Sequence, residues 1–299
     1  MIIVSYRGQE LLRDCLASLR EHPASRPTRI HVVDNASNDG TAEMVAREFP
    51  EVELTANTEN RGFSAANNQA IRASRAPYVL VLNPDTRITD GALDRLCGLL
   101  DERPEVGICG PRLVQEDGTF DHAAKRSFPT PLGALAHFTG LGRSSASGRL
   151  SQYRATELGE FEAGPVDAVN GAFMLIRRAA LEEIGPFDEG YWMYMEDLDL
   201  SYRFREAGWV TWYEPSVTVG HAKAGSSGKH RALRLNYAFH YGMFRFYRSH
   251  YAADHNPAYN LAIYAGIAAK FAVSAVRSAV ARAVRWRPGR PHAGGGATP

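Results

Sequence analysis

The sequence predicts the α/β fold class, with a mostly parallel sheet flanked by helices. Short apolar runs alternate with segments of helical periodicity over the first hundred residues, and the connections between them are short. The chain has 299 residues, of which 44% are hydrophobic and 22% are charged, so it can bury a sizeable core in one or two domains. Ligands of such sheets bind at the carboxyl ends of the strands, which makes the polar segments there candidate sites.

Strands and helices are expected in regular alternation from the N-terminus. Ile2–Tyr6 is a short apolar run that predicts a buried strand, and Leu12, Cys15 and Leu19 repeat at helical spacing in the helix expected at Glu10–Arg20. The next apolar runs predict strands at Arg29–Asp34, Val52–Thr55 and Tyr78–Leu82. Helices are expected between and after them, at Thr41–Phe49, Ser64–Arg75 and Ala92–Asp101. Further along the chain, Val166–Arg177 is again apolar, and Trp209–Val219 is strand-like.

Charge is distributed unevenly along the chain. The net charge is +1, but Pro215–Pro299 contains one acid, Asp254, and twelve lysines and arginines. That segment therefore carries +11, which leaves −10 for residues 1–214. Such asymmetry indicates that the C-terminal part faces an anionic membrane surface or phosphates. No zinc-finger, helix-turn-helix or RNA-binding signature is present, so we expect no nucleic-acid partner.

Cysteine usage and the ends of the chain suggest an intracellular protein. The chain has three cysteines, Cys15, Cys97 and Cys109, and their spacing fits neither a disulfide framework nor a zinc site. We therefore expect buried free thiols in a reducing cytosol. We expect no signal peptide, because Ile2 already belongs to the first strand. No uninterrupted apolar run reaches the roughly 20 residues that span a bilayer, so we also expect no transmembrane segment.

The segment Tyr191–Gly208 carries the most distinctive chemistry. Glu196, Asp197 and Asp199 lie in a run that is otherwise largely aromatic and apolar. Carboxylates are costly to bury unless they are paired, bound to metal or used in chemistry, and apolar surroundings tune them toward accepting a proton. The alternative is a helix N-terminus, whose dipole favours acids in its first turn.

Three further polar motifs occur near predicted strand ends and helix starts. Asp34–Thr41 could accept hydrogen bonds from a pyrimidine or a ribose, and Asn60–Asn68 places Arg61 where a phosphate could meet a cation and helix N–H groups. Asn83-Pro84-Asp85 ends an apolar strand with a carboxylate suited to Mg²⁺. Each of the three could instead be an ordinary turn or helix cap.

His221 follows the strand-like run Trp209–Val219. A lone histidine is more often structural than a ligand, and it gains a metal-binding role only if the fold brings it near Asp85. Two competing motifs are incomplete or absent. Gly140-Leu141-Gly142 lacks the third glycine of the dinucleotide fingerprint, and no Walker P-loop is present, which argues against phosphoryl transfer from ATP.

Taken together, these motifs resemble the family 2 glycosyltransferases, which have the GT-A fold. The resemblance covers roughly residues 1–250, and within the family the chain looks most like bacterial rhamnosyltransferases acting on N-acetylglucosaminyl-diphospho-polyprenol. Six segments carry it, in the family's order: IIVSY at Ile2–Tyr6, VVDNASNDGT at Val32–Thr41, NRGFSAANN at Asn60–Asn68, LNPD at Leu82–Asp85, NGAFMLIRR at Asn170–Arg178 and MEDLDLSYR at Met195–Arg203.

The resemblance implies a role for each matching residue. Asp197 would be the general base, with Glu196 and Asp199 supporting it, and Asp85 with His221 would hold Mg²⁺ or Mn²⁺. The nucleotide-sugar donor would be bound by Ser5, Tyr6, Asp34, Asn35, Arg61, Gly62, Asn83, Asn170 and Gly171. Two positions depart from the family pattern: Asn83-Pro84-Asp85 has one acid where Asp-x-Asp is common, and Arg7 replaces a small polar residue.

The implied reaction is an inverting transfer of L-rhamnose from dTDP-L-rhamnose to a lipid-linked GlcNAc-diphospho-polyprenol, in cell-wall polysaccharide synthesis. One alternative is the same fold with a UDP-sugar donor, for galactofuranosyl or GlcNAc transfer. Another is a non-catalytic nucleotide-sugar-binding protein, although the intact Asp85, Asp197 and His221 argue against it.

The C-terminal segment predicts a basic amphipathic helix. Val273, Val276, Val280 and Val284 form one stripe of Asn260–Trp286, with Arg282 and Arg285 off it and Arg277 at its edge. This helix would lie on an anionic membrane surface, which places the protein peripherally at the cytoplasmic face of the plasma membrane. The alternative is packing on its own domain or on a partner subunit in a homodimer. Lys229, Arg231 and Arg234 would instead meet a diphosphate.

The expected organisation has three parts. Residues 1–224 form a GT-A catalytic domain, with a nucleotide-sugar half at about 1–110 and an acceptor half at about 111–224. Residues 225–287 form a helical basic region, and residues 288–299 a disordered tail. Ser144–Ser151 and Gly225–Lys229 are expected to be flexible loops.

Overall fold

The computed structural model describes residues 1–129, 158–222 and 233–285. The loops predicted at Ser144–Ser151 and Gly225–Lys229, the basic residues Lys229 and Arg231, and the tail predicted at 288–299 lie outside the described residues.

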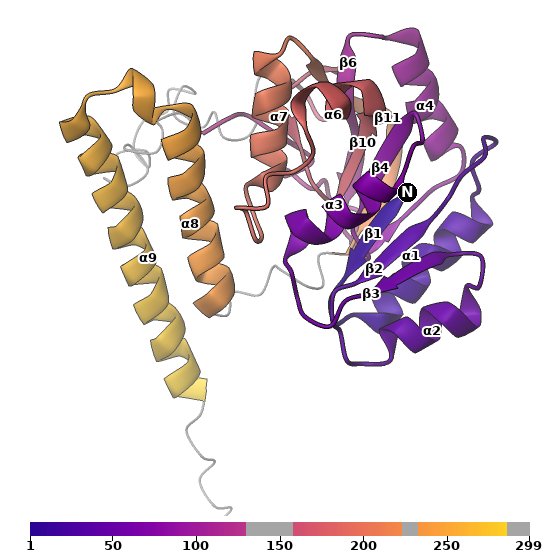
Figure 1. The fold of residues 1–299 in the computed structure, drawn as a ribbon, viewed down its shortest axis with the longest axis horizontal. Coiled ribbons are helices and arrows are strands. Elements are labelled where there is room, and N and C mark those ends of the chain that lie inside the picture. The colour runs from indigo at the N-terminus through magenta and orange to yellow at the C-terminus, as the bar shows by residue number, and fades with distance from the viewer. Residues whose placement is uncertain (130–157, 223–232, 286–299) are drawn as a thin grey trace, which may run out of the picture.

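A nine-stranded mixed sheet forms the centre of the molecule (Figure 1). Its β1, β2, β3 and β4 are parallel, as the alternating sequence predicts, whereas β10 runs antiparallel to both neighbours, β4 and β6. Across the sheet the order is β3 (Glu53–Ala56), β2 (His31–Asp34), β1 (Ile2–Ser5), β4 (Tyr78–Leu82), β10 (Phe173–Arg177), β6 (Val106–Val114), β11 (Val210–His221) and β5 (Thr86–Arg87), with β8 (Gly164–Pro165) paired to β11.

The antiparallel direction of β10 determines which residues lie at the candidate site. Phe173 at the start of β10 pairs with Leu82 at the end of β4, so the residues just before β10 lie at the same sheet edge as the residues just after β4. A two-stranded sheet of β7 (Lys125–Arg126) and β9 (Ala168–Val169) lies close to the acidic helix α7, which packs against β9.

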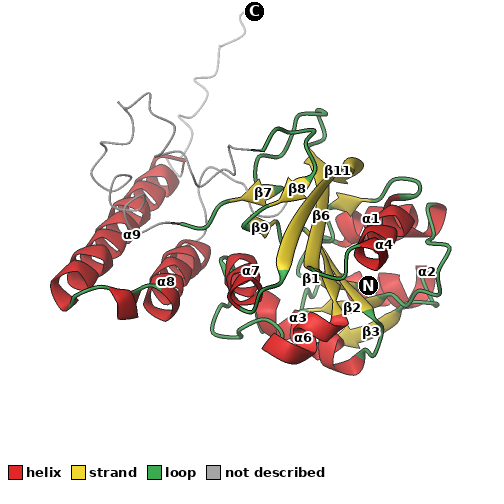
Figure 2. Cartoon of the chain, turned by 90° about the horizontal axis from the view of Figure 1, so that it is seen from above, coloured by secondary structure: helices red, strands yellow, loops and turns green. Residues whose placement is uncertain are grey.

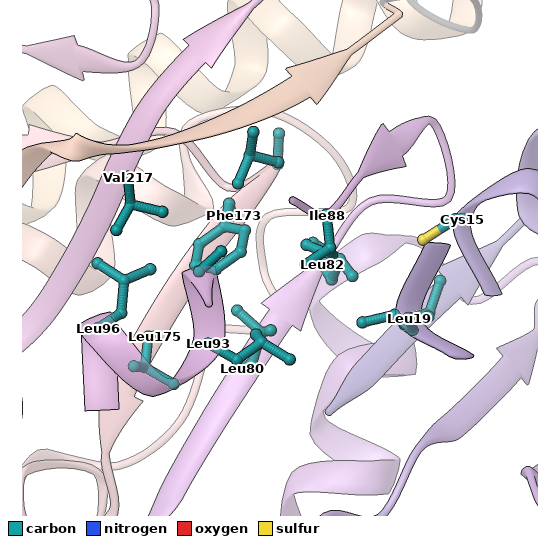
Figure 3. Packing of buried hydrophobic residues seen from close by; sticks show 14 of the residues in the cluster. Cys15, Leu19, Leu80, Leu82, Ile88, Leu93, Leu96, Phe173, Leu175 and Val217 are labelled. Atoms are coloured by element: carbon teal, nitrogen blue, oxygen red, sulfur yellow. The ribbon is translucent and has the colours of Figure 1, made fainter. Parts of the chain in front are cut away.

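Helices cover both faces of the sheet because alternate strand residues point to opposite sides. Leu80 and Leu82 of β4 share one core cluster with α1 (Gln9–Glu21), α2 (Thr41–Glu48) and α4 (Ala92–Glu102), whereas Val79 and Val81 share another with α3 (Phe63–Ala73), α6 (Arg178–Ile184) and α7 (Glu196–Glu206). The first cluster includes Phe173 of β10 and Leu96 of α4 (Figure 3). The helices and strands predicted over the first hundred residues are confirmed to within two residues at each end.

Beside the sheet, α7 is followed by α8 (Leu233–His250) and then by α9 (Pro257–Arg285), with the short turn η2 (Ala252–Asp254) between α8 and α9 (Figures 1 and 2). Phe246 of α8 packs edge-on against Tyr202 of α7 at a centroid distance of 5.6 Å. On its other side, α8 packs through Tyr247 against Ile263 and Ile267 of α9. We call α8 and α9 the C-terminal hairpin.

The outer face of α9 is apolar and exposed. Val273, Val276 and Val280 are 52%, 62% and 56% exposed, so these three valines do not pack on the described part of the chain. The helix itself does pack on its own chain, through Ile263 and Ile267 against α8. The segment Pro257–Val280 is also long and apolar enough to cross a membrane. The expectation that no segment reaches this threshold is therefore wrong, because Pro257–Val280 contains only two charged residues, Lys270 and Arg277.

Replacing Leu82 by Ala should destabilise the protein by about 2–5 kcal/mol, because it removes a fully buried side chain and leaves a cavity between the sheet and the helices. Urea denaturation followed by circular dichroism measures the change. The matched control is Leu261→Ala, which removes the same atoms from a side chain that is 68% exposed. Equal losses for the two variants would contradict the packing described here.

Candidate active site

The loop after β2 is fixed to the loop before α3 by a buried asparagine. Asn35 accepts the backbone N–H of Arg61 at 3.0 Å and donates to Asn60 Oδ1 at 3.1 Å and to the Gly62 carbonyl at 3.2 Å. Asp34, at the end of β2, accepts the Ser37 hydroxyl. Two of the segments expected to bind the nucleotide are thus brought together at the carboxyl edge of the sheet.

The other predicted donor residues line the same edge with different exposure. Ser5, at the end of β1, is fully buried, and its hydroxyl has no hydrogen-bond partner among the described residues. Tyr6 is 44% exposed, and the Arg7 guanidinium lies over its ring at 5.2 Å. Arg61 is exposed, so its guanidinium is accessible to a ligand.

Gly62 joins this donor side to the acidic helix. Its φ of +84° lies in the region that favours glycine, and an added Cβ would overlap the carbonyl oxygen and ring of Trp192. The next residue, Phe63, donates its backbone N–H to that Trp192 carbonyl at 2.7 Å. The start of α3 is therefore hydrogen-bonded to the segment that leads into α7.

Asp85 and His221 lie side by side, as a shared metal site requires. His221 Nε2 is 3.5 Å from Asp85 Oδ1, and both side chains are at least nine-tenths buried. On the opposite side of the ring, Nδ1 is 3.1 Å from Asp121 Oδ2. A carboxylate on the second ring nitrogen fixes the orientation of a histidine ligand. Asp121 was not predicted, because nothing in its local sequence marks it.

A divalent cation fits this pair only with help from the substrate. No cluster of three or more His, Cys, Asp or Glu side chains suited to a metal occurs among the described residues. Mg²⁺ commonly uses one or two protein ligands and completes its shell with waters and substrate phosphates. One carboxylate and one imidazole at a strand edge match that pattern.

Glu196 and Asp197 are the first two residues of α7, and both are buried. Asp197 Oδ2 accepts the Gly171 N–H at 2.9 Å and forms an ion pair with Arg126 of β7. Its Oδ1 accepts the Leu198 N–H at 2.8 Å. A buried carboxylate is stable when its charge is paired and hydrogen-bonded in this way, and the helix N-terminus adds to the effect.

The surroundings of Glu196 raise its pKa. Its Oε2 has no hydrogen-bond partner among the described residues. Burial, followed by the negative charge of Asp197, raises the pKa of Glu196 to about 8 from its ordinary value of 4.5. The pair therefore holds a proton on Glu196 at neutral pH. Both interpretations of the sequence apply at once, since the acids begin a helix and also form an unusual buried pair.

Asp199 is contacted by two basic side chains, Arg203 and His250. It accepts Arg203 Nε at 2.8 Å and lies 2.8 Å from His250 Nε2 of α8. Burial opposes its ionisation, but the His250 hydrogen bond and the Arg203 charge outweigh burial and lower the pKa of Asp199. This carboxylate is placed to support its helix rather than to contact a substrate.

A short chain of hydrogen bonds connects Asn83, which follows β4, to the turn before β10 that contacts Asp197. The Asn83 N–H donates to the Ala172 carbonyl at 2.9 Å, and Asn170 Oδ1 accepts the Ala172 N–H at 2.9 Å. A Cβ on Gly171 would lie 3.3 Å from Asp197 Oδ2, so a larger residue would crowd the carboxylate. The predicted residues Asn83, Asn170 and Gly171 are thus neighbours in space.

Sequence reasoning missed the basic side chains that contact Asp197 and Asp199. Arg126 and His250 lie 71 and 51 residues from the aspartates they contact, and neither belongs to a motif. The sequence carries only an indirect signal of them. Buried acids require partners, so such partners had to come from elsewhere in the chain.

This fold and this edge define a mixed α/β protein with a candidate ligand site at the carboxyl ends of its strands and a buried acidic pair. The family model described as "Glycosyl transferase family 2" matches residues 1–185. An N-acetylglucosaminyl-diphospho-decaprenol L-rhamnosyltransferase of Mycobacterium tuberculosis is 32% identical over 246 residues, which cover 79% of each chain. A low-salt glycan biosynthesis hexosyltransferase of Haloferax volcanii is 27% identical over 209 residues, 69% of this chain and 61% of that protein.

Solved structures agree on the fold. A mannosyltransferase from Pyrobaculum calidifontis in complex with GDP-Man and Mn²⁺ matches with a TM-score of 0.56 and 19% identity, covering 97% of this chain and 75% of that one. GalNAc-T7 with UDP, GalNAc and Mn²⁺ matches with a TM-score of 0.58 and 14% identity, over 83% and 47% of the two chains.

The chain belongs to glycosyltransferase family 2, and it is a glycosyltransferase with the GT-A fold. The family resemblance and the fold class expected from the sequence are confirmed.

Replacing Glu196 by Gln should make the unfolding free energy less dependent on pH. The folded-state pKa of about 8 lies above the ordinary 4.5, so this group's stabilising contribution is full below pH 4.5 and is lost as pH rises through about 8. Glutamine has no proton to lose, so the stability of the variant relative to wild type should rise across this window and then level off. Urea denaturation at a series of pH values measures it. The exposed Glu59→Gln is the control, and a flat difference for Glu196→Gln would contradict the raised pKa.

Proposed function

We propose that this enzyme transfers L-rhamnose from dTDP-L-rhamnose to a lipid-linked GlcNAc-diphospho-polyprenol, with inversion at the anomeric carbon. The observation that carries the proposal is the 32% identity to the mycobacterial rhamnosyltransferase over 79% of both chains. That alignment is long enough to include both halves of the candidate site. The joined donor loops and the buried acidic pair provide the chemistry that such a transfer needs.

In this proposal, the donor lies along the carboxyl edge of β1, β2 and β4. Asp34 and Asn35 face the nucleoside beside Ser5 and Tyr6, and the exposed Arg61 at the start of α3 faces the diphosphate. Gly62, Asn83, Asn170 and Gly171 border the sugar, since they connect this edge to Asp197.

Asp85 and His221 would hold a divalent cation, with Asp121 orienting the imidazole. When bound, the cation would neutralise the charge that develops on the departing nucleotide diphosphate. Mg²⁺ and Mn²⁺ both suit one carboxylate and one imidazole supplemented by phosphate oxygens.

Asp197 would act as the general base. Arg126 and the Gly171 N–H hold its carboxylate in place, so it can accept the proton of the acceptor hydroxyl during in-line attack on the anomeric carbon. A single displacement of this kind inverts the anomeric configuration. Glu196, which holds a proton at neutral pH, can donate a hydrogen bond to the acceptor, and Asp199 supports the helix.

We also propose that α9 lies in the membrane interface at the cytoplasmic face, where a polyprenyl-linked acceptor would be found. Its outward valines are exposed, whereas its inner face packs on α8. A position across the bilayer would draw α8 with it, and α8 carries Arg234, Arg245 and Arg248. An interfacial position buries the apolar face alone. Residues 1–224 would then form the catalytic domain and residues 225–287 the attachment region.

Mixing the enzyme with dTDP-L-rhamnose, a synthetic GlcNAc-diphospho-lipid and Mg²⁺ should release dTDP. Release should require both the acceptor and the metal, and Asp197→Asn should lower kcat by about 10²–10⁴-fold, because a positioned base contributes that much. Donor affinity, measured by calorimetry with dTDP, should be unchanged in this variant.

Release of UDP from a UDP-sugar, without release of dTDP from dTDP-L-rhamnose, would contradict the rhamnose assignment and leave the reaction class intact. Full turnover by Asp197→Asn would contradict the assignment of the base. The melting temperature of the variant shows whether lost turnover reflects lost folding.

Replacing Val276 by Asp should weaken binding to anionic vesicles about tenfold or more, since it places a charge in the middle of the exposed apolar face. Vesicle co-sedimentation measures the binding. The control Ala56→Asp adds the same charge to an exposed residue of β3, distant from α9 in Figure 1. Equal binding by both variants would contradict a membrane role for this face.

A further inference from the structure

Helix α8 contacts the segment that presents Glu196 and Asp197 at several points. This segment runs from Asp188 to Asp199 and contains the turn Tyr194–Met195, which immediately precedes α7. Three of the contacts come from Gly242, Arg245 and His250, which lie along one stretch of α8. Each contact fixes a different part of the segment.

The middle contact supports a strained turn. Tyr194 and Met195 have φ of 71° and 72°, a left-handed conformation that non-glycine residues rarely adopt and that persists only where the surroundings enforce it. Gly242 faces this turn directly. A Cβ at Gly242 would lie 3.0 Å from both the Tyr194 carbonyl oxygen and Met195 Cγ. The absence of a side chain there lets α8 press closely against the turn.

The contact at the start of the segment is a bidentate ion pair. Arg245 donates from Nε to Asp188 Oδ2 at 2.8 Å and from Nη2 to Asp188 Oδ1 at 2.9 Å. Its guanidinium lies over Gly190, where an added Cβ would overlap it. Bidentate pairs of this kind fix orientation as well as distance.

The contact at the end of the segment is a buried hydrogen bond. His250 Nε2 is 2.8 Å from Asp199 Oδ1, and the His250 ring lies 4.2 Å from the Tyr202 ring and 4.7 Å from the Phe246 ring. Asp199 is only two residues after Asp197 on the first turn of α7. A shift of α8 would therefore move Asp199 and the first turn of α7.

We propose that α8 is a positioning element of the active site: Gly242, Arg245 and His250 hold the turn Tyr194–Met195 and thereby aim Glu196 and Asp197. This inference rests on the proposed function for the identity of the reaction. The three residues act through the turn and through Asp199. Small displacements of a reacting group cost large factors in rate, so the C-terminal hairpin contributes to turnover as well as to membrane attachment.

Gly242→Ala separates positioning from attachment, because Gly242 is buried against the turn and leaves the outer face of α9 unchanged. Activity is measured without vesicles, on a water-soluble short-chain GlcNAc-diphosphate acceptor. We expect kcat to fall about tenfold, with KM for dTDP-L-rhamnose unchanged. The matched control is Gly98→Ala in α4, which makes the same change in a helix where a Cβ meets nothing within 4 Å. It should keep wild-type kcat.

Hydrogen exchange provides a second measurement that needs no substrate. The Asp199 N–H donates to the Met195 carbonyl at 2.9 Å across the turn, so loosening the turn should speed exchange at Asp199. Gly242→Ala and Arg245→Gln should show faster exchange there, Arg245→Lys a smaller change, and Gly98→Ala none.

Unchanged exchange at Asp199 in both Gly242→Ala and Arg245→Gln would overturn the proposal, as would wild-type kcat in both. If wild type and Gly98→Ala release no dTDP, the proposed donor is wrong, and exchange at Asp199 still decides whether α8 holds the turn.

Discussion

The stable burial of the Asp197 carboxylate is the constraint on which the rest of the site depends. An ionised carboxylate removed from water costs several kcal/mol unless a cation and hydrogen bonds replace its hydration. Three separate parts of the chain supply them: Arg126 from the small sheet, the Gly171 N–H from the turn before β10, and the N-terminus of α7. The location of this one charge therefore requires that all three parts fold together.

The direction of β10 makes that convergence possible. Because β10 is antiparallel to β4, its first residues lie where β4 ends, and the turn that contains Asn170 and Gly171 meets Asn83. A parallel strand in this position would carry the same turn to the opposite edge of the sheet. The residues proposed to bind the donor, to hold the metal and to act as the base are thus brought together by the antiparallel direction of β10 in a mixed sheet.

The sequence predicts much of this arrangement, for identifiable reasons. Short apolar runs predict the first four strands, and the carboxylates at the ends of two of them make Asp34 and Asp85 candidate ligand contacts. The direction of β10 could not be predicted, since a buried apolar strand looks the same in either direction. Arg126, Asp121 and His250 could not be predicted either, because each reaches its partner across at least 51 residues of sequence. The exposure of the valines on α9 required knowing which side of the helix α8 covers.

The left-handed turn Tyr194–Met195 raises the question of why glycine does not occupy it. A glycine at either position would adopt the same backbone angles without a steric penalty, and would relieve of the order of 1 kcal/mol or more of strain. The same glycine would also widen the range of conformations open to the turn. Met195 is only 5% exposed and belongs to a core cluster against which Tyr194 also packs, so a glycine at 195 would leave a cavity that costs about 2–5 kcal/mol. The packing of these side chains therefore outweighs the strain of their backbone, and this is how a strained turn can persist in a stable fold.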